Sequence, residues 1–99
     1  MSEQQNQEIQ IKAQDDQLKG NYSNAVQVTH NKEEFVLDFM NIFPWQKLGL
    51  LISRIILSPS HAKRLAGALQ ENVKKYEEQN GSIELGNDKL NEKVGFKTE

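Results

Sequence analysis

The chain of 99 residues contains no cysteine, only two histidines and a single tryptophan. Without cysteine it has no disulfide, no thiolate zinc site and no thiol nucleophile. No apolar run approaches the about 20 residues that a membrane-spanning helix needs, and the N-terminus lacks the charged-then-apolar pattern of a signal peptide. We therefore expect a cytoplasmic protein that is stabilised without covalent cross-links.

An excess of positive charge is also missing, because twelve Lys and Arg residues face fourteen Asp and Glu residues. This balance argues against a general nucleic-acid binder, which is normally basic. The chain has no glycine-rich phosphate loop and no recognisable nucleophile motif. His30 and His61 have no ligand partner at metal-binding spacing, and we interpret them as a turn residue and a helix-start residue. We expect no catalysis, no cofactor and no metal.

Both ends of the chain are polar. Residues 1–8 and residues 82–99 cannot bury enough apolar surface to offset the entropy of ordering, so we predict that the first are disordered and the second mostly disordered. A single domain over residues 9–81 remains. A core of this size gives only marginal stability, and self-association is the usual remedy when disulfides and metals are absent.

The pattern of apolar residues predicts an antiparallel sheet of three or four strands. Residues 22–30 alternate with a period of two, and residues 35–43 and 49–57 are strongly apolar. Residues 8–13 alternate weakly and are expected to form a short edge strand, followed by a loop. The segments HNKE and PWQK separate the strands as turns.

A long amphipathic helix follows the strands. Ser58 and Pro59 are typical of an N-cap followed by a proline in the first helical position, and Asn80-Gly81 is a stop signal. At 100° per residue, six apolar residues span an arc of about 100°, the width of a core-facing stripe: Ala62, Leu65, Ala66, Leu69, Val73 and Tyr76. The fold class is therefore α+β, with this helix expected to pack on one face of the sheet.

One charge of opposite sign lies inside each apolar strand, in EFVLDF and in SRIILSP. A hairpin centred near Gln46 places Asp38 across from Arg54, as an ion pair that also determines the register. The same register predicts three apolar pairs: Val36–Ile56, Met40–Ile52 and Ile42–Leu50. A catalytic aspartate or an anion-binding arginine is the less favoured interpretation, because no histidine, serine or second carboxylate joins the two.

This register makes both faces of the sheet apolar. The expected seat of the helix carries Val26, Val28, Phe35, Leu37, Phe39, Phe43, Leu51, Ile55 and Leu57. The second face surrounds the ion pair with Val36, Met40, Ile42, Leu50, Ile52 and Ile56. The free face of a monomeric antiparallel sheet is normally polar, so we predict that the second face is an interaction surface. Trp45 in the loop is either a core plug, which we favour, or an exposed anchor at that interface.

These features predict a non-enzymatic protein-interaction module that forms a homo-oligomer, a dimer or a tetramer, with chaperone-like binding of a polypeptide client or partner protein. The alternative is a nucleic-acid-associated or regulatory protein whose basic contacts lie on the helix: Lys63, Arg64, Lys74 and Lys75. Glutamates interleave with these residues, which favours a solvated face of mixed charge.

Two segments carry a resemblance to a known family. GNYSNAVQVTHNKEEFVLDF and SRIILSPSHAKRLAGALQENVKKYEEQNG together resemble short bacterial and archaeal proteins catalogued as domain of unknown function 3467, over residues 9–83. That family carries no established activity, so the resemblance supports the fold and adds little about function. The loop PWQKLG and the polar C-terminal tail depart from it. The order of elements is also distantly similar to SecB-type export chaperones, which implies oligomers that hold unfolded clients.

Overall fold

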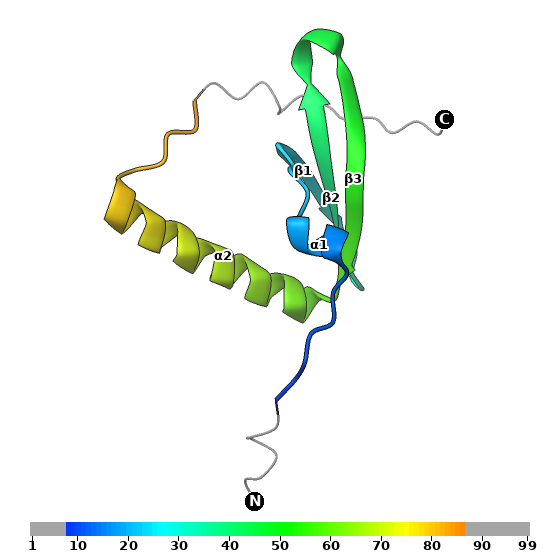
Figure 1. The fold of residues 1–99 in the computed structure, drawn as a ribbon, viewed down its shortest axis with the longest axis vertical. Coiled ribbons are helices and arrows are strands. Elements are labelled where there is room, and N and C mark those ends of the chain that lie inside the picture. Colours follow the sequence, from blue (N-terminus) through cyan, green and yellow to red (C-terminus); the bar gives the residue numbers. More distant parts are fainter. Residues whose placement is uncertain (1–7, 87–99) are drawn as a thin grey trace, which may run out of the picture.

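The computed structural model describes residues 8–86. Its elements are α1 (Asp15–Lys19), β1 (Ala25–His30), β2 (Phe35–Phe43), a 3-10 turn at Pro44–Gln46, β3 (Leu48–Leu57) and α2 (Pro59–Asn80) (Figure 1). The strands form one antiparallel sheet in the order β1-β2-β3. This confirms the predicted α+β class, a three-stranded sheet followed by a long helix. Most of the two predicted disordered tails lies outside the described residues.

A tight turn joins β1 to β2, as the segment HNKE predicts. The side-chain oxygen of Asn31 accepts hydrogen bonds from the backbone of Glu33 (2.7 Å) and Glu34 (3.0 Å). The backbone N–H of Asn31 also donates to the carbonyl of Glu34. Asparagine is favoured in turns for this local bonding. The rings of His30 and Phe35 then stack across the strands with centroids 5.1 Å apart, so His30 is a structural residue next to the turn.

The segment before β1 differs from its prediction. Residues 8–13 are exposed and form no strand, so within the described residues the sheet has three strands. β1 begins at Ala25 and not at residue 22. Asn24 continues the pairing with its side chain, which donates to the carbonyl of Ile42 (3.0 Å) and accepts from the Ile42 N–H (2.8 Å). The chain thus stays attached to β2 although it has left the regular ladder.

The short helix α1 lies in a segment predicted to be a loop. The Gln14 N–H donates to the side chain of Gln17 at 2.8 Å, which satisfies one of the free donors at the helix start. Asp15 and Asp16 lie in the first turn and Lys19 in the last, which complements the helix dipole. No apolar periodicity marks this helix, and none of its residues is buried.

The hairpin of β2 and β3 follows the predicted register along half of its length. Asp38 lies opposite Arg54 and Val36 opposite Ile56, as expected. A bulge interrupts the ladder between Phe39 and Met40. Beyond it, Met40 pairs with Leu51 and Ile42 with Gly49, so the predicted pairs Met40–Ile52 and Ile42–Leu50 are wrong.

The turn explains this shift. The N–H of Lys47 donates to the carbonyl of Pro44 at 3.1 Å, and Lys47 adopts a left-handed conformation with φ of 50°. This geometry closes Phe43 onto Leu48, which is one residue out of step with the Asp38–Arg54 pair. An extra residue on β3, Ile52, reconciles the two registers, as bulges do.

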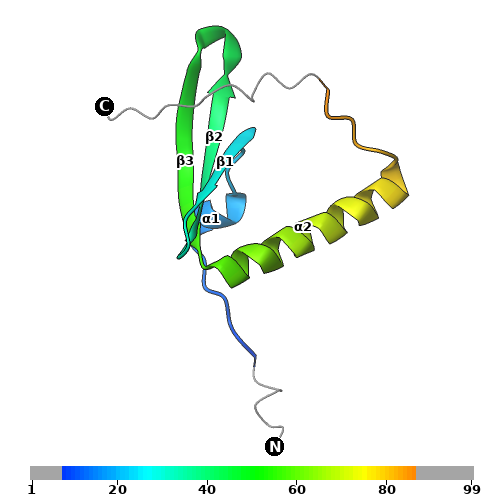
Figure 2. The ribbon, with the colours of Figure 1, turned by 180° about the vertical axis from the view of Figure 1, so that it is seen from behind.

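The helix α2 starts and stops where the sequence predicts. The Ser58 hydroxyl accepts from the His61 N–H at 3.2 Å, and the N–H of Gly81, with φ of +90°, donates to the carbonyl of Glu77. The predicted packing of α2 on the sheet is not seen within the chain. The extensive contacts among the described elements join β1 to β2 and β2 to β3, and α2 diverges from the sheet after β3 (Figures 1 and 2).

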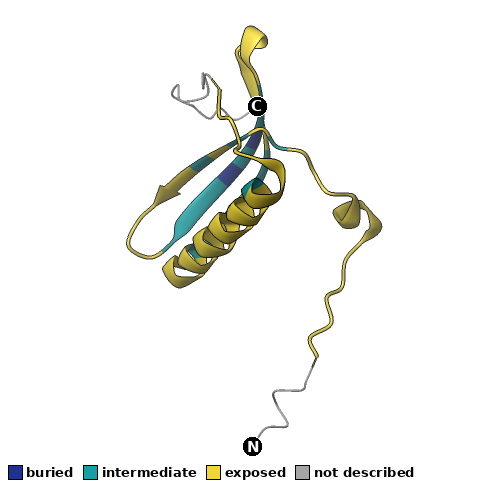
Figure 3. Ribbon diagram, turned by 90° about the vertical axis from the view of Figure 1, so that its left-hand side faces the viewer, coloured by how far each residue is buried: buried dark blue, intermediate teal, exposed yellow. Residues whose placement is uncertain are grey.

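The described part of the chain therefore has almost no core of its own. Met40 and Asp38, each 3% exposed, are the only buried residues among those that the structure describes. Both lie on the central strand β2 (Figure 3). No residue of α2 is buried. The six residues that were expected to face a core along α2 thus form an open stripe, which we call the helix stripe.

Candidate functional site

The Asp38–Arg54 ion pair lies at the centre of the sheet. Arg54 Nε is 2.5 Å from Asp38 Oδ1, and Arg54 Nη2 is 3.2 Å from Asp38 Oδ2, so the contact is bidentate. The side chain of Asp38 is buried, whereas that of Arg54 is 50% exposed. The hydrogen bond to Asp38, with the negative charge of its carboxylate, raises the pKa of the Arg54 guanidinium above its ordinary value. The predicted cross-strand pair is confirmed.

The neighbours of the pair favour a structural role. Gln27 of β1 lies opposite Asp38 on the other side, and its side-chain oxygen is buried without a hydrogen-bond partner. Among residues 8–86 no three histidine, aspartate or glutamate side chains lie close enough together to hold a metal ion. A buried carboxylate that accepts from two donors of one arginine is compatible with the predicted role of setting the register of β2 and β3. Proton transfer or metal binding would need further groups beside it.

The bulge changes which residues share a face of the sheet, because directly opposed residues point to the same side. We define the ion-pair face by Val36, Asp38, Met40, Leu51, Arg54 and Ile56, and the aromatic face by Val26, Val28, Phe35, Leu37, Phe39 and Ile55. Leu51 joins Met40 on the ion-pair face, whereas Leu50 pairs with Asn41 on the other side. The predictions for Leu50 and Leu51 are therefore wrong, and Leu51 is the residue that sequence reasoning missed.

The other residues predicted for the interaction surface lie on β2 and β3 around the ion pair. Val36 and Ile42 are partly buried and Met40 is buried, and Ile42 lies on the same side of β2 as Val36 and Met40, which extends the ion-pair face toward the hairpin tip. Ile56 is exposed beside Arg54. Ile52 is the unpaired residue of the bulge and is partly buried.

Trp45 lies at the tip of the β2–β3 hairpin. Its side chain is 88% exposed, so the favoured prediction of a core plug is wrong and the alternative, an exposed aromatic anchor, fits the structure. β1 pairs with β2 only as far as Met40, so the tip of the β2–β3 hairpin projects beyond the end of β1 (Figure 1). Phe43 and Leu48, paired at the base of the tip, are exposed as well.

The helix α2 separates its apolar and charged residues. Its four basic residues lie away from the helix stripe at 100° per residue: Lys63, Arg64, Lys74 and Lys75. Glu71 is 3.9 Å from Lys75, one turn away, and Glu78 lies on the same side. Four positive and three negative charges along the helix make a mixed surface and not a basic patch.

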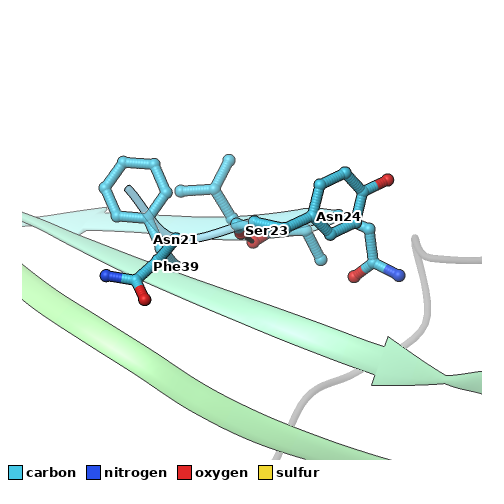
Figure 4. A pocket seen from close by; sticks show the side chains of 7 residues that line it. Asn21, Ser23, Asn24 and Phe39 are labelled. Atoms are coloured by element: carbon cyan, nitrogen blue, oxygen red, sulfur yellow. Dashed lines mark hydrogen bonds between the residues drawn. The ribbon is translucent and has the colours of Figure 1, made fainter. Parts of the chain in front are cut away.

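An open depression lies beside the start of β1. Figure 4 shows Asn21, Ser23, Asn24 and Phe39 around it, and Tyr22, Ala25 and Val26 complete the lining. This set includes no carboxylate, histidine, lysine or arginine, so the depression has none of the usual acid–base groups except a tyrosine hydroxyl.

No helix in the described part of the chain is long and apolar enough to cross a membrane.

Comparison with known proteins identifies a family without a known activity. No curated protein matches the chain significantly, and no solved structure does. The distant similarity to SecB-type chaperones therefore gains no support. The family described as "Protein of unknown function (DUF3467)" matches residues 1–85, which include every strand and helix of the structure. The sequence resemblance is thus confirmed, and the chain belongs to the DUF3467 family.

Proposed function

We propose that the protein is a non-enzymatic interaction module that works as a homo-oligomer, a dimer or a tetramer. The observation that carries this proposal is the near absence of a core, since only Met40 and Asp38 are buried among residues 8–86. Ordering one residue costs about 1–2 kcal/mol in backbone entropy. A sheet with two open faces and a helix with an open stripe bury too little apolar surface to offset that cost. Another chain supplies the missing cover.

Burial of the open apolar side chains would supply a large part of the free energy that an assembly needs. Seven of them, on the helix stripe and the aromatic face, are roughly half exposed: Val26, Val28, Ile55, Leu65, Leu69, Val73 and Tyr76. Burying the exposed half of each contributes about 1 kcal/mol, which gives about 14 kcal/mol for the two chains of a dimer. Association costs about 4–15 kcal/mol, so this gain offsets most or all of it.

Light scattering on a size-exclusion column tests the proposal. A dilution series should give the mass of a dimer or tetramer over a wide range of concentrations. A monomer at every concentration would overturn the proposal, because the apolar faces would then be open to solvent or reserved for a different protein.

We infer that the oligomer binds extended polypeptide at its remaining apolar surface, near the hairpin tip. Trp45 is the only tryptophan, so its fluorescence reports on this region alone. Addition of an unfolded polypeptide should shift the emission to shorter wavelength, whereas the same polypeptide in its folded form should not. An emission unchanged by both forms would argue against binding at the tip.

The nucleic-acid alternative lacks a comparable observation. Lys63 and Arg64 stand in the first half of α2, but Glu71, Glu77 and Glu78 interleave with the later lysines. Contacts with phosphates would weaken steeply with salt, and a gel shift at low salt is the direct test. We expect no shift. The cytoplasmic location stays a prediction.

A further inference from the structure

The joint between β3 and α2 keeps the helix away from its own sheet. One residue, Ser58, separates Leu57 at the end of β3 from Pro59 at the start of α2. Ser58 is extended, with φ of −67° and ψ of 157°, and its hydroxyl is engaged by the His61 N–H. The ring of Pro59 restricts the φ of Pro59 itself to a narrow range. Connections between strands and the helices that pack on their sheet commonly have two to six residues, so a one-residue joint disfavours folding back.

The helix stripe is open as a consequence. Leu69, at its middle, is 61% exposed, and Leu65, Val73 and Tyr76 are exposed on either side of it. At 100° per residue Glu77 borders the stripe, and the other charged residues of α2 lie further round the helix. This surface therefore needs an uncharged partner surface of similar length.

The aromatic face has the matching chemistry. None of its six residues is charged, and Val26, Val28 and Ile55 are exposed. The ion-pair face is less suitable, because it carries the buried Asp38 and the half-exposed Arg54. A helix stripe without charges offers no partner to the Asp38–Arg54 pair, so it packs more favourably on the aromatic face.

The dimensions of the two surfaces also agree. From Ala62 to Tyr76 the stripe is about 21 Å long, at about 1.5 Å per residue. From Phe35 to Phe43 the strand β2 is about 27 Å long, at about 3.4 Å per residue. A helix about 10 Å across covers two inter-strand spacings of about 4.8 Å, which is the width of this sheet.

We propose that α2 of a second copy of this chain lies on the aromatic face, and that each copy covers the other in return. This inference rests on the proposed homo-oligomer and specifies its interface. The exchange makes a two-fold symmetric dimer, in which the same two surfaces meet twice. Two contacts of about 21 by 10 Å, counted on both partners, bury about 840 Å² if the surfaces are treated as flat. This is close to the about 1,000 Å² of a stable interface.

Cross-linking between differently marked chains tests this exchange. The chain has no cysteine, so single-cysteine variants react only where intended. Leu69→Cys chains are mixed with Val28→Cys chains and treated with a short bismaleimide. Each chain carries one cysteine, so a mixed dimer forms only when the helix stripe of one chain lies near the aromatic face of another. Lys75→Cys, on the charged side of α2, replaces Leu69→Cys in the control mixture. We expect at least ten times more mixed dimer with Leu69→Cys.

Two failures can be told apart. If light scattering gives an oligomer but the mixed dimer forms no faster than in the control, helix exchange is wrong and the homo-oligomer stands. If light scattering gives a monomer, both proposals fail. Should Leu69→Cys not fold by circular dichroism, Val73→Cys paired with Val26→Cys asks the same question. Equal cross-linking of that pair and the control would also overturn helix exchange.

Discussion

Removing either partner of the Asp38–Arg54 pair should lower the free energy of unfolding by different amounts, because only one of the two charges is buried. Asp38 is buried and both its carboxylate oxygens accept from Arg54, whereas Arg54 is half exposed. Replacing Arg54 by Met keeps the apolar stem but leaves the Asp38 carboxylate without these donors. An uncompensated buried carboxylate costs about 3 kcal/mol or more. Replacing Asp38 by Ala leaves an arginine that can turn to water, so this variant should lose less. The buried charge of the pair is therefore Asp38 and not Arg54.

Equilibrium unfolding in urea measures the cycle, with the two single variants and the double variant Asp38→Ala/Arg54→Met. All proteins are compared at one concentration, because association changes apparent stability. Arg64→Met, which removes a positive charge from the exposed side of α2, is the matched control and should change little. The double variant should be more stable than Arg54→Met alone, because the stranded carboxylate is gone.

Strict additivity would refute this reasoning. If the losses of Asp38→Ala and Arg54→Met simply add in the double variant, the two side chains do not interact in solution. If Asp38→Ala proves the more damaging of the two single changes, the burial assigned to each charge is wrong.

Five further variants test three local features by thermal unfolding. Lys47→Gly should raise stability by about 1 kcal/mol, because it relieves a left-handed lysine, whereas Gln46→Gly should lower it. Deleting Ile52 removes the bulge but preserves every strand pair, so the loss should be far smaller than for deleting Ile55. Ser58→Ala should cost about 1 kcal/mol through the lost cap; an unchanged melting temperature would contradict that role.

The predictions from sequence succeeded where one local signal decides the structure. The strand from Phe35 to Phe43 and the helix from Pro59 were predicted from apolar period and from the Ser58–Pro59 cap, and their limits agree to about one residue. The charged pair Asp38–Arg54 was predicted because each residue is alone among apolar neighbours. In contrast, α1 is capped by the side chain of Gln17 and carries no apolar period, so a pattern of hydrophobicity does not reveal it.

The register beyond the bulge depends on two signals that disagree. The ion pair places Phe39 opposite Ser53, whereas the turn ending at the left-handed Lys47 places Phe43 opposite Leu48. A regular ladder cannot satisfy both, and counting residues from either end hides the conflict. The ion pair and the turn together require one extra residue between them on β3. The faces of Leu50 and Leu51 were misassigned for this reason alone.

The position of α2 links helix stability to assembly. Isolated helices are marginal in water, and in proteins most of their stability comes from packing of an apolar stripe. The Ser58–Pro59 joint keeps the stripe of α2 from its own sheet, and in the proposed dimer that packing comes from a second copy of the chain. In that dimer, formation of α2 and association of the chains are coupled, so the helix content changes with the fraction of associated chains. Dilution below the dissociation constant should therefore lower the helical signal together with the mass, because the monomer retains the sheet hydrogen bonds but loses the cover of α2.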